Sequence, residues 1–178
     1  MGKIIGVFSG KGGVGKTTLV ANLGALLANV HHKNVLIVDL NVYTAHLGLH
    51  YGVYENMPVT LREVLSGKVP VSYATYIHPS TGVRILLAPL NADDVAISQE
   101  KLDGIMNELR DNYDWIIIDS APGLGKEALI TMSLIDDALL VTTPDLPSVT
   151  DVIKSKNLLD RLQKNVVGLV VNRYNSKK

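Results

Sequence analysis

The sequence predicts an α/β fold, a three-layer sandwich in which helices cover both faces of a mainly parallel β-sheet. Short β-branched runs alternate with stretches of helical periodicity along all 178 residues. The runs are almost continuously apolar, which is typical of parallel strands buried on both faces. Such an alternation requires right-handed crossover connections. We therefore expect one domain over residues 1–178, with its ligand site at the carboxyl ends of the strands.

The individual elements follow from the same periodicities. The expected strands are residues 3–9, 34–39, 82–89, 114–120, 137–143 and 166–172. The expected helices are residues 16–28, 60–66, 98–111, 125–133 and 148–163. The least regular segment, 40–59, is expected to form a long loop at the ligand site with one short helix. The last strand is expected to be buried.

Composition narrows the class of protein. Residues of the hydrophobic class make up 47% and aromatic residues only 5%, so the core is aliphatic. The formal net charge is zero, so no overall field attracts nucleic acid or anionic lipid, and we expect no nucleic-acid partner. The absence of cysteine excludes disulfides, thiolate metal sites and a cysteine nucleophile. Without a signal segment or a span of ~20 apolar residues, we expect a cytoplasmic protein.

A local basic patch remains an alternative. Its members would be Lys33, Lys154, Lys156, Arg161 and Lys164. Surface helices commonly carry lysines at such positions, which is the competing interpretation.

The segment Gly10–Thr18, with the letters GKGGVGKTT, is the most informative part of the chain. It lies between an expected strand and an expected helix, the context that a phosphate-binding loop needs. Glycines let successive backbone N–H groups turn toward an anion, and the helix start adds its positive dipole end. Lys16 is expected to reach the β- and γ-phosphates, and the Thr17 hydroxyl to ligate Mg²⁺. The residues expected to bind the nucleotide here are Gly10, Gly12, Gly13, Val14, Gly15, Lys16, Thr17 and Thr18.

The same glycines also fit a dinucleotide fingerprint. Gly10, Gly12 and Gly15 have its spacing, and Asp39 lies 24 residues after Gly15 (39 − 15). That fingerprint does not ask for the lysine and threonine that follow Gly15, because a pyrophosphate has no terminal phosphate to hold and needs no Mg²⁺. A third interpretation, a glycine-rich turn that binds no ligand, does not explain this lysine and threonine either. The triphosphate interpretation is therefore favoured.

Two aspartates end apolar runs at the same expected edge of the sheet. Asp39 ends the second run and Asp119 the fourth. A carboxylate beside a phosphate loop can hold a Mg²⁺-bound water or the attacking water. The alternative is that a lone Asp at this position caps the following loop. We expect Thr17, Asp39 and Asp119 to form the metal site. Gly123 is expected to approach the terminal phosphate and to let its loop move when that phosphate leaves.

With these residues in place, the chain resembles the MinD/ParA family of deviant Walker A ATPases over essentially its whole length. The deviation is Lys11, in the first half of the loop. The resemblance is closer to MinD, including archaeal MinD and flagellar-number ATPases, than to plasmid-partition ParA. Residues 46–49 (HLGL) look like an Asn-Leu-Gly-Leu stretch of MinD-like proteins, and 119–124 (DSAPGL) like their Asp-Ser-Pro-Ala-Gly-Ile segment. Asn172 and Arg173 match the family's adenine-contacting end of a late strand, although Asn172 could equally cap a turn.

The resemblance implies a P-loop NTPase with ATP and Mg²⁺ as cofactors. It also implies a homodimer in the ATP-bound state, a regulatory protein partner, and a role in spatial organisation such as cell-division site placement. Lys11 would then cross to the partner subunit's nucleotide and stabilise the transferring phosphoryl group, as an arginine finger does. The catalytic residues that it implies are Lys11, Lys16, Asp39 and Asn41.

The chain departs from the family pattern in two places. Asn41 stands where the family has an aspartate that positions or activates the attacking water. An amide can orient a water but cannot take its proton, so slow ATP hydrolysis is expected, and Asn41 could be natural or engineered. The chain also ends at residue 178, whereas family members continue and MinD ends in an amphipathic membrane helix. Truncation and a minimal paralogue both explain this, and peripheral membrane association is expected only of a longer form.

Two other classes of function stay open on the sequence. One is a metabolic enzyme on the same scaffold, a kinase or an ATP-dependent ligase similar to dethiobiotin synthetase. Its substrate pocket would use Tyr43, Thr44, His46, His50 and Tyr51. The alternative is that these are loop residues that face solvent. The other is a scaffold or adaptor that binds no nucleotide.

Overall fold

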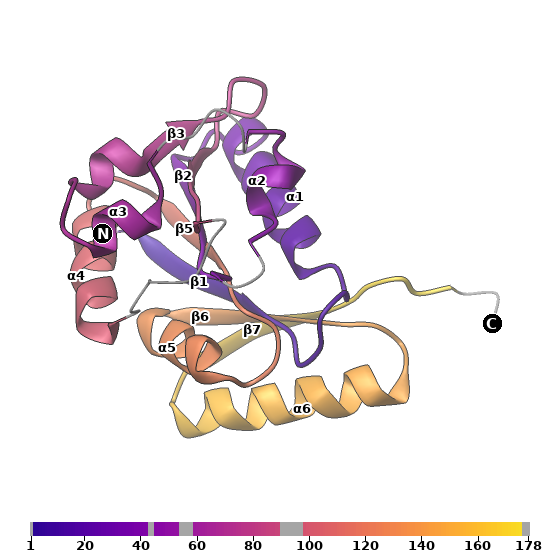
Figure 1. The fold of residues 1–178 in the computed structure, drawn as a ribbon. Helices are drawn as coiled ribbons and strands as arrows, with labels where there is room; N and C mark the ends of the chain where they lie inside the picture. The colour runs from indigo at the N-terminus through magenta and orange to yellow at the C-terminus, as the bar shows by residue number, and fades with distance from the viewer. Residues whose placement is uncertain (1, 43–44, 54–58, 90–97, 176–178) are drawn as a thin grey trace.

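The computed structural model describes residues 2–42, 45–53, 59–89 and 98–175, and it confirms the predicted α/β class (Figure 1). The strands are β1 (Lys3–Phe8), β2 (Val35–Asp39), β3 (Thr75–Ile77), β4 (Arg84–Leu86), β5 (Trp115–Asp119), β6 (Asp137–Thr142) and β7 (Asn165–Val171). The helices are α1 (Lys16–Asn29), α2 (Leu47–His50), α3 (Leu61–Leu65), α4 (Gln99–Arg110), α5 (Lys126–Leu134) and α6 (Leu146–Arg161), with a short 3₁₀-helix, η2 (Val71–Ala74).

The sheet has the strand order β3-β4-β2-β5-β1-β6-β7. All neighbouring pairs are parallel except β3 and β4, which are antiparallel. The six predicted strands are present, with β4 shorter than expected. The sequence did not predict β3, because three residues are too few to show a strand period. It forms a hairpin with β4 that is closed by the bond from His78 N to Val83 O (2.8 Å).

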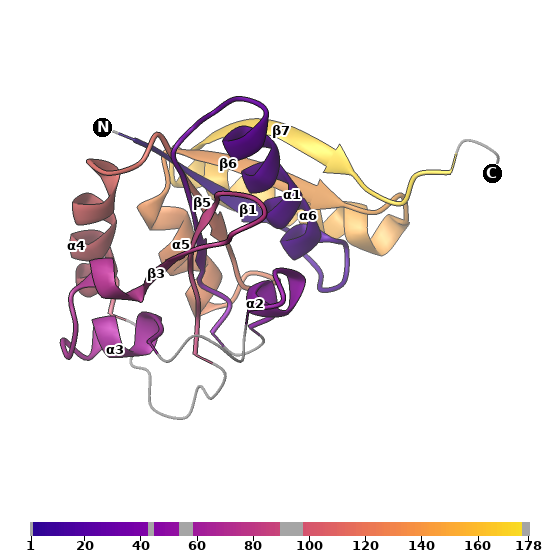
Figure 2. The ribbon, with the colours of Figure 1, turned by 90° about the horizontal axis from the view of Figure 1, so that it is seen from above.

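Helices cover both faces of the sheet and make the three layers (Figure 2). Leu36 and Ile37 illustrate why: successive residues of a strand point to opposite faces, and both side chains are fully buried. Leu36 belongs to a core shared with α3, α4, α5 and α6, and Ile37 to a core shared with α1 and α2. Helix α4 contributes a stripe at helical spacing, consisting of Leu102, Met106 and Leu109.

The prediction that the last strand is buried is wrong. β7 is an edge strand: among the described residues only β6 pairs with it, and exposure alternates along it. Val167, Leu169 and Val171 are 51%, 52% and 46% exposed. Aliphatic composition alone does not distinguish a central strand from an edge strand, because both read as apolar runs.

The irregular segment 40–59 contains the short helix that was expected, α2. Residues 43–44 and 54–58 of this segment lie outside the described residues. In the described ranges, no helix is both long and apolar enough to cross a membrane.

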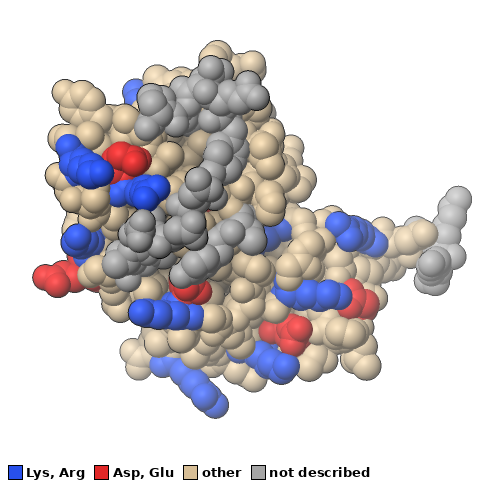
Figure 3. All heavy atoms as spheres, viewed as in Figure 1, with Lys and Arg blue, Asp and Glu red and all other residues tan. Residues whose placement is uncertain are grey.

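Three of the five residues of the candidate basic patch have close partners. Lys154 pairs with Asp151 (2.9 Å) and Lys156 with Asp160 (2.6 Å), while Lys164 Nζ donates to the carbonyl oxygens of residues 133 and 135. Figure 3 shows basic and acidic side chains interspersed on the face that it presents. These contacts favour the interpretation as ordinary surface lysines.

Candidate functional site

The loop between β1 and α1 has the backbone that an anion cradle needs. Gly13 and Gly15 have φ angles of 76° and 98°, which side-chain-bearing residues rarely adopt. Gly15 is also the N-cap of α1, and it supplies no side-chain acceptor to the first N–H groups of the helix. A Cβ atom at Gly12 or Gly13 would meet open space. The loop therefore presents unsatisfied donors around a space where an anion can fit.

Gly10 and Gly15 also lie close to other parts of the chain. A Cβ atom at Gly10 would collide with Asp151 of α6, and one at Gly15 with the amide of Asn172. Asn172 Nδ2 donates to Val14 O (2.8 Å), and its Oδ1 accepts from Arg173 N (2.9 Å). Asn172 thus joins the loop to the segment after β7.

Lys16 and Thr17 both bond to one buried carboxylate. Lys16 Nζ lies 2.5 Å from Asp119 Oδ1 and also donates to Ser120 O, and Thr17 Oγ1 donates to Asp119 Oδ2 (2.6 Å). The Lys16 side chain is only 7% exposed. A buried ammonium needs an anion, and here the end of β5 supplies it. The structure thereby brings Lys16, Thr17 and Asp119 together at the end of β5, whereas the sequence analysis expected Lys16 on the phosphates and the other two on Mg²⁺.

Asp39 lies beside Asp119, because the two residues are register partners on β2 and β5. Its oxygens accept from Asn41 N (2.9 Å) and Leu47 N (3.4 Å). Burial and, secondly, the negative charge of Asp119 raise the pKa of Asp39 to about 7, and the two backbone bonds and Lys16 offset this only in part. Two carboxylates at adjacent strand ends are an arrangement that attracts a cation.

An open cavity of about 500 Å³ lies over the loop. Of the predicted residues, it is lined by Gly12, Gly13, Gly15, Lys16, Thr17, Thr18, Asn41 and Arg173. It is also lined by Ser9, His46, His50 and Pro122, which the sequence analysis did not assign to the nucleotide site. Ser9 follows β1 and Pro122 closely follows β5, and this was the signal available for them, since the carboxyl ends of parallel strands meet at one edge. His46 and His50 lie further along the chain from β2, at the two ends of α2.

His46 and His50 therefore lie at the phosphate loop itself. His50 Nε2 is 3.1 Å from Thr18 Oγ1, and its Nδ1 is 3.1 Å from His46 O. Tyr51, expected in a separate substrate pocket, is buried and donates its hydroxyl to Ala21 O (2.9 Å). Tyr43 and Thr44 lie outside the described residues. The described part of this loop thus supplies one structural tyrosine and two histidines of the main site.

Lys11 lies near the start of α6. Its Nζ lies 3.9 Å from Asp145 Oδ1, and its side chain is 52% exposed. Asp145 is the N-cap of α6 and accepts from Ser148 N (3.1 Å). Within its own chain, Lys11 is therefore held loosely at the start of α6, where solvent can reach it.

Gly123 adopts the left-handed backbone conformation, with a φ angle of 80°. Its N–H donates to Ser9 O (3.0 Å). The segment after β5 is thus attached directly to the start of the phosphate loop.

Comparisons with known proteins agree with this geometry. A family model described as ParA, a NUBPL iron-transfer P-loop NTPase, matches residues 1–176. An uncharacterised ATP-binding protein of Methanocaldococcus jannaschii is 36% identical over 173 residues, which make up 97% of this chain and 64% of that protein. This chain thus spans less than two thirds of the length of that curated relative.

Solved structures agree as well. The septum site-determining protein MinD of Pyrococcus horikoshii, solved with Mg-ADP, matches with a TM-score of 0.89 and 33% identity. The match covers 100% of this chain and 72% of that one. A MinC:MinD cell division protein complex of Aquifex aeolicus also gives a TM-score of 0.89 and 33% identity, covering 98% of this chain and 70% of that one.

Proposed function

The chain belongs to the ParA/MinD family of P-loop NTPases, and on this premise we propose that it binds and slowly hydrolyses ATP with Mg²⁺. The observation that supports this most is the loop between β1 and α1. It combines left-handed glycines, open space beside Gly12 and Gly13, and a lysine that already holds an anionic partner. The Mg-ADP complex of the MinD relative supports the choice of ligand.

The donor atoms present fit Mg²⁺. The Thr17 hydroxyl and the carboxylates of Asp39 and Asp119 are hard oxygen ligands, and they converge at the ends of neighbouring strands. When bound, the ion would neutralise the charge on the phosphates. A cation beside Asp39 would also favour the ionised form of a carboxyl group whose pKa burial has raised.

Other groups of the site would bind the phosphates and orient the attacking water. Lys16 would exchange its bond with Asp119 for the β- and γ-phosphate oxygens, while backbone N–H groups of residues 12–18 cradle them. Asn41 lines the same cavity, and its amide oxygen would orient the attacking water. Because an amide takes no proton, hydrolysis would depend on positioning and charge alone.

The proposal includes an ATP-dependent dimer that acts as a switch. Lys11 is exposed and weakly held by Asp145, so it is free to reach a partner subunit's nucleotide at little cost. The segments after Asp39 and Asp119 would become ordered by the γ-phosphate and form the dimer face. The MinD relatives support a role in spatial organisation, such as placing the division site, with a regulatory partner protein.

The iron-transfer function in the description of the family model is not part of this proposal. Any cysteine ligand for iron would have to come from outside these 178 residues. None of the 178 residues is a cysteine.

Calorimetry with ATP and Mg²⁺ tests the nucleotide site. Lys16→Ala should lower the affinity for ATP at least about tenfold, because a charge-assisted bond to the phosphates is lost. Lys68→Ala, at an exposed lysine away from the loop, should leave the affinity unchanged. Equal affinity in the parent protein and the Lys16 variant would refute the proposal.

A further inference from the structure

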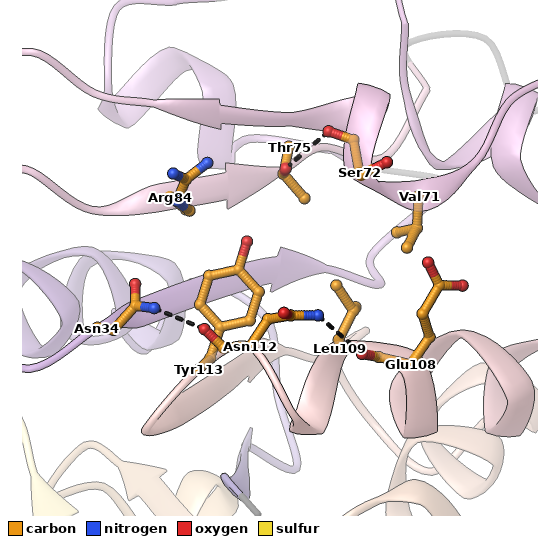
Figure 4. A pocket seen from close by; sticks show the side chains of 9 residues that line it. All are labelled: Asn34, Val71, Ser72, Thr75, Arg84, Glu108, Leu109, Asn112 and Tyr113. Atoms are coloured by element: carbon orange, nitrogen blue, oxygen red, sulfur yellow. Dashed lines mark hydrogen bonds between the residues drawn. The ribbon is translucent and has the colours of Figure 1, made fainter.

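A second cavity lies at the opposite end of the sheet from the phosphate loop. It has a volume of about 320 Å³ and is open to solvent (Figure 4). Asn34 precedes β2, Arg84 opens β4 and Tyr113 precedes β5, so the cavity lies at the amino ends of these strands. Its outer wall comes from η2 and its floor from the end of α4. The nucleotide proposal uses none of these residues.

Two side chains of opposite charge line this cavity without pairing. Neither the Arg84 guanidinium nor the Glu108 carboxylate makes a hydrogen bond or ion pair with any residue that the structure describes. In Figure 4 they stand on opposite sides of the Tyr113 ring. Arginine offers up to five donors in a planar fork, and an ionised glutamate only accepts. The cavity therefore presents one unused donor group and one unused acceptor group.

The remaining wall is preformed. Thr75 Oγ1 donates to Ser72 O (3.1 Å), and Asn34 Nδ2 to Asn112 O (2.5 Å). Asn112 Nδ2 in turn donates to Glu108 O (3.1 Å), which fixes the end of α4. A wall that is already bonded loses little entropy when a ligand enters.

Part of the cavity lining is apolar. Val71 and Leu109 are buried side chains that line it. The Tyr113 ring lies between them and Arg84, and its hydroxyl has no hydrogen-bond partner among the described residues. Apolar walls with a few unpaired polar groups are the usual composition of a small-molecule site, and the volume is at the lower end of that class.

We propose that this cavity binds a small amphoteric molecule, with an anionic oxygen group on Arg84 and an amino group on Glu108. A carboxylate matches the guanidinium fork, and an ammonium group supplies the donors that the glutamate lacks. A ligand with only one charge would leave the other protein charge unpaired. The aliphatic or aromatic body of the ligand would pack on Val71, Leu109 and the Tyr113 ring. This site is independent of the nucleotide function.

Nuclear magnetic resonance titration with ω-amino carboxylates of increasing length tests the proposal. The probes are glycine, 4-aminobutyrate, 6-aminohexanoate and 8-aminooctanoate, because the best length reports the separation of the two charges. One of them should give saturable shifts of the amides of Ser72, Thr75, Arg84, Leu109 and Tyr113. The matching carboxylate and the matching alkylamine, each lacking one charge, should bind about tenfold more weakly.

Variants test whether ligand binding depends on the charges of Arg84 and Glu108. Arg84→Gln and Glu108→Gln should each weaken binding about tenfold, whereas the controls Arg161→Gln and Glu100→Gln should not change it. The double variant Arg84→Glu, Glu108→Arg should recover binding, because the ligand can turn end for end. Absence of saturable shifts with every probe would overturn the proposal. Equal binding of the singly charged analogues, or unchanged binding in both Gln variants, would overturn it as well.

Discussion

Asp39 and Asp119 show how neighbouring residues of one type acquire different properties. Both carboxylates are buried at the ends of adjacent strands. Asp119 has the Lys16 ammonium group and the Thr17 hydroxyl as direct partners, whereas Asp39 accepts backbone N–H groups. Burial and the charge of Asp119 therefore raise the pKa of Asp39 to about 7. Ionisation of Asp39 therefore costs free energy in the folded protein, and the Mg²⁺ ion that we propose would offset this cost.

Replacement of Asp39 by asparagine should stabilise the nucleotide-free protein in a pH-dependent way. The pKa of this group is about 7 in the folded state, against about 3.9 in the unfolded chain. The folded state binds more protons between these values, so stability falls as the pH rises from about 4 to about 7. Asp39→Asn removes this loss, and it should raise the free energy of unfolding at pH 8 by on the order of 2 kcal/mol.

Urea denaturation at pH 8 and pH 4.5 measures the effect. The advantage of the variant should shrink toward zero at the lower pH, where the folded parent protein carries a neutral Asp39. If Asp39→Asn raised the free energy of unfolding equally at both pH values, the charge of Asp39 would not be the cause of the increase.

Asn41→Asp should raise ATP turnover at least several-fold. A carboxylate at this position can accept the proton of the attacking water as well as orient it, which the amide cannot do. Phosphate release at saturating ATP and Mg²⁺ gives the rate. Asn107→Asp, at an exposed position of α4, is the matched control. If the Asn41 variant kept the parent rate, residue 41 would not position the water.

Among the individual elements, α3 shows how side chains that satisfy backbone donors can stabilise a short helix. Helix α3 begins with a capping box at Thr60 and Glu63. Thr60 N and Thr60 Oγ1 both donate to Glu63 Oε2 (2.8 Å each), and Arg62 N donates to Thr60 Oγ1 (3.3 Å). These bonds hold a helix of only five residues, which is too short to be stable by propensity.

Thr60→Ala should therefore lower the free energy of unfolding by about 1 kcal/mol. Thermal or urea unfolding measures the loss. Thr150→Ala, at a threonine inside α6 whose hydroxyl bonds back to Leu146 O, should have a smaller effect. The cap would be unimportant if both variants had the parent stability.

The elements that sequence reasoning missed or misjudged lie at the two edges of the sheet. β3 has three residues and owes its existence to pairing with β4. β7 is aliphatic but half exposed, because its position at the edge follows from the order of the strands. An apolar run predicts that a strand forms, and the neighbours of that strand decide how far it is buried.

At the scale of the whole molecule, the sheet separates two candidate sites. The carboxyl ends of β1, β2 and β5 carry the proposed nucleotide site, and the amino ends of β2, β4 and β5 carry the proposed amphoteric site. Parallel strands make this possible, because their equivalent ends gather on one side. The proposed dimer would form at the nucleotide end.

Light scattering after size-exclusion chromatography tests the dimer. With ATP and Mg²⁺ the parent protein should have twice the mass that it has with ADP or without nucleotide. Lys11→Ala should remain a monomer in all three conditions, because the crossing charge is absent. Lys33→Ala is a control at an exposed lysine outside the loop. A monomer mass for the parent protein under every condition would contradict the switch.

The fold class, the glycine-rich loop between β1 and α1 and the positions of Asp39 and Asp119 at strand ends could all be predicted from the amino-acid sequence. These features depend on local chemistry: glycines that allow unusual backbone angles, apolar periodicity, and polar residues that end buried strands. The contacts of Lys16 with Asp119, of Lys11 with Asp145 and of Asn172 with Val14 became evident from the three-dimensional fold alone. It alone also placed Arg84 and Glu108 in one cavity. These pairs are distant in the sequence, and their meeting depends on strand order and register, which local patterns do not encode.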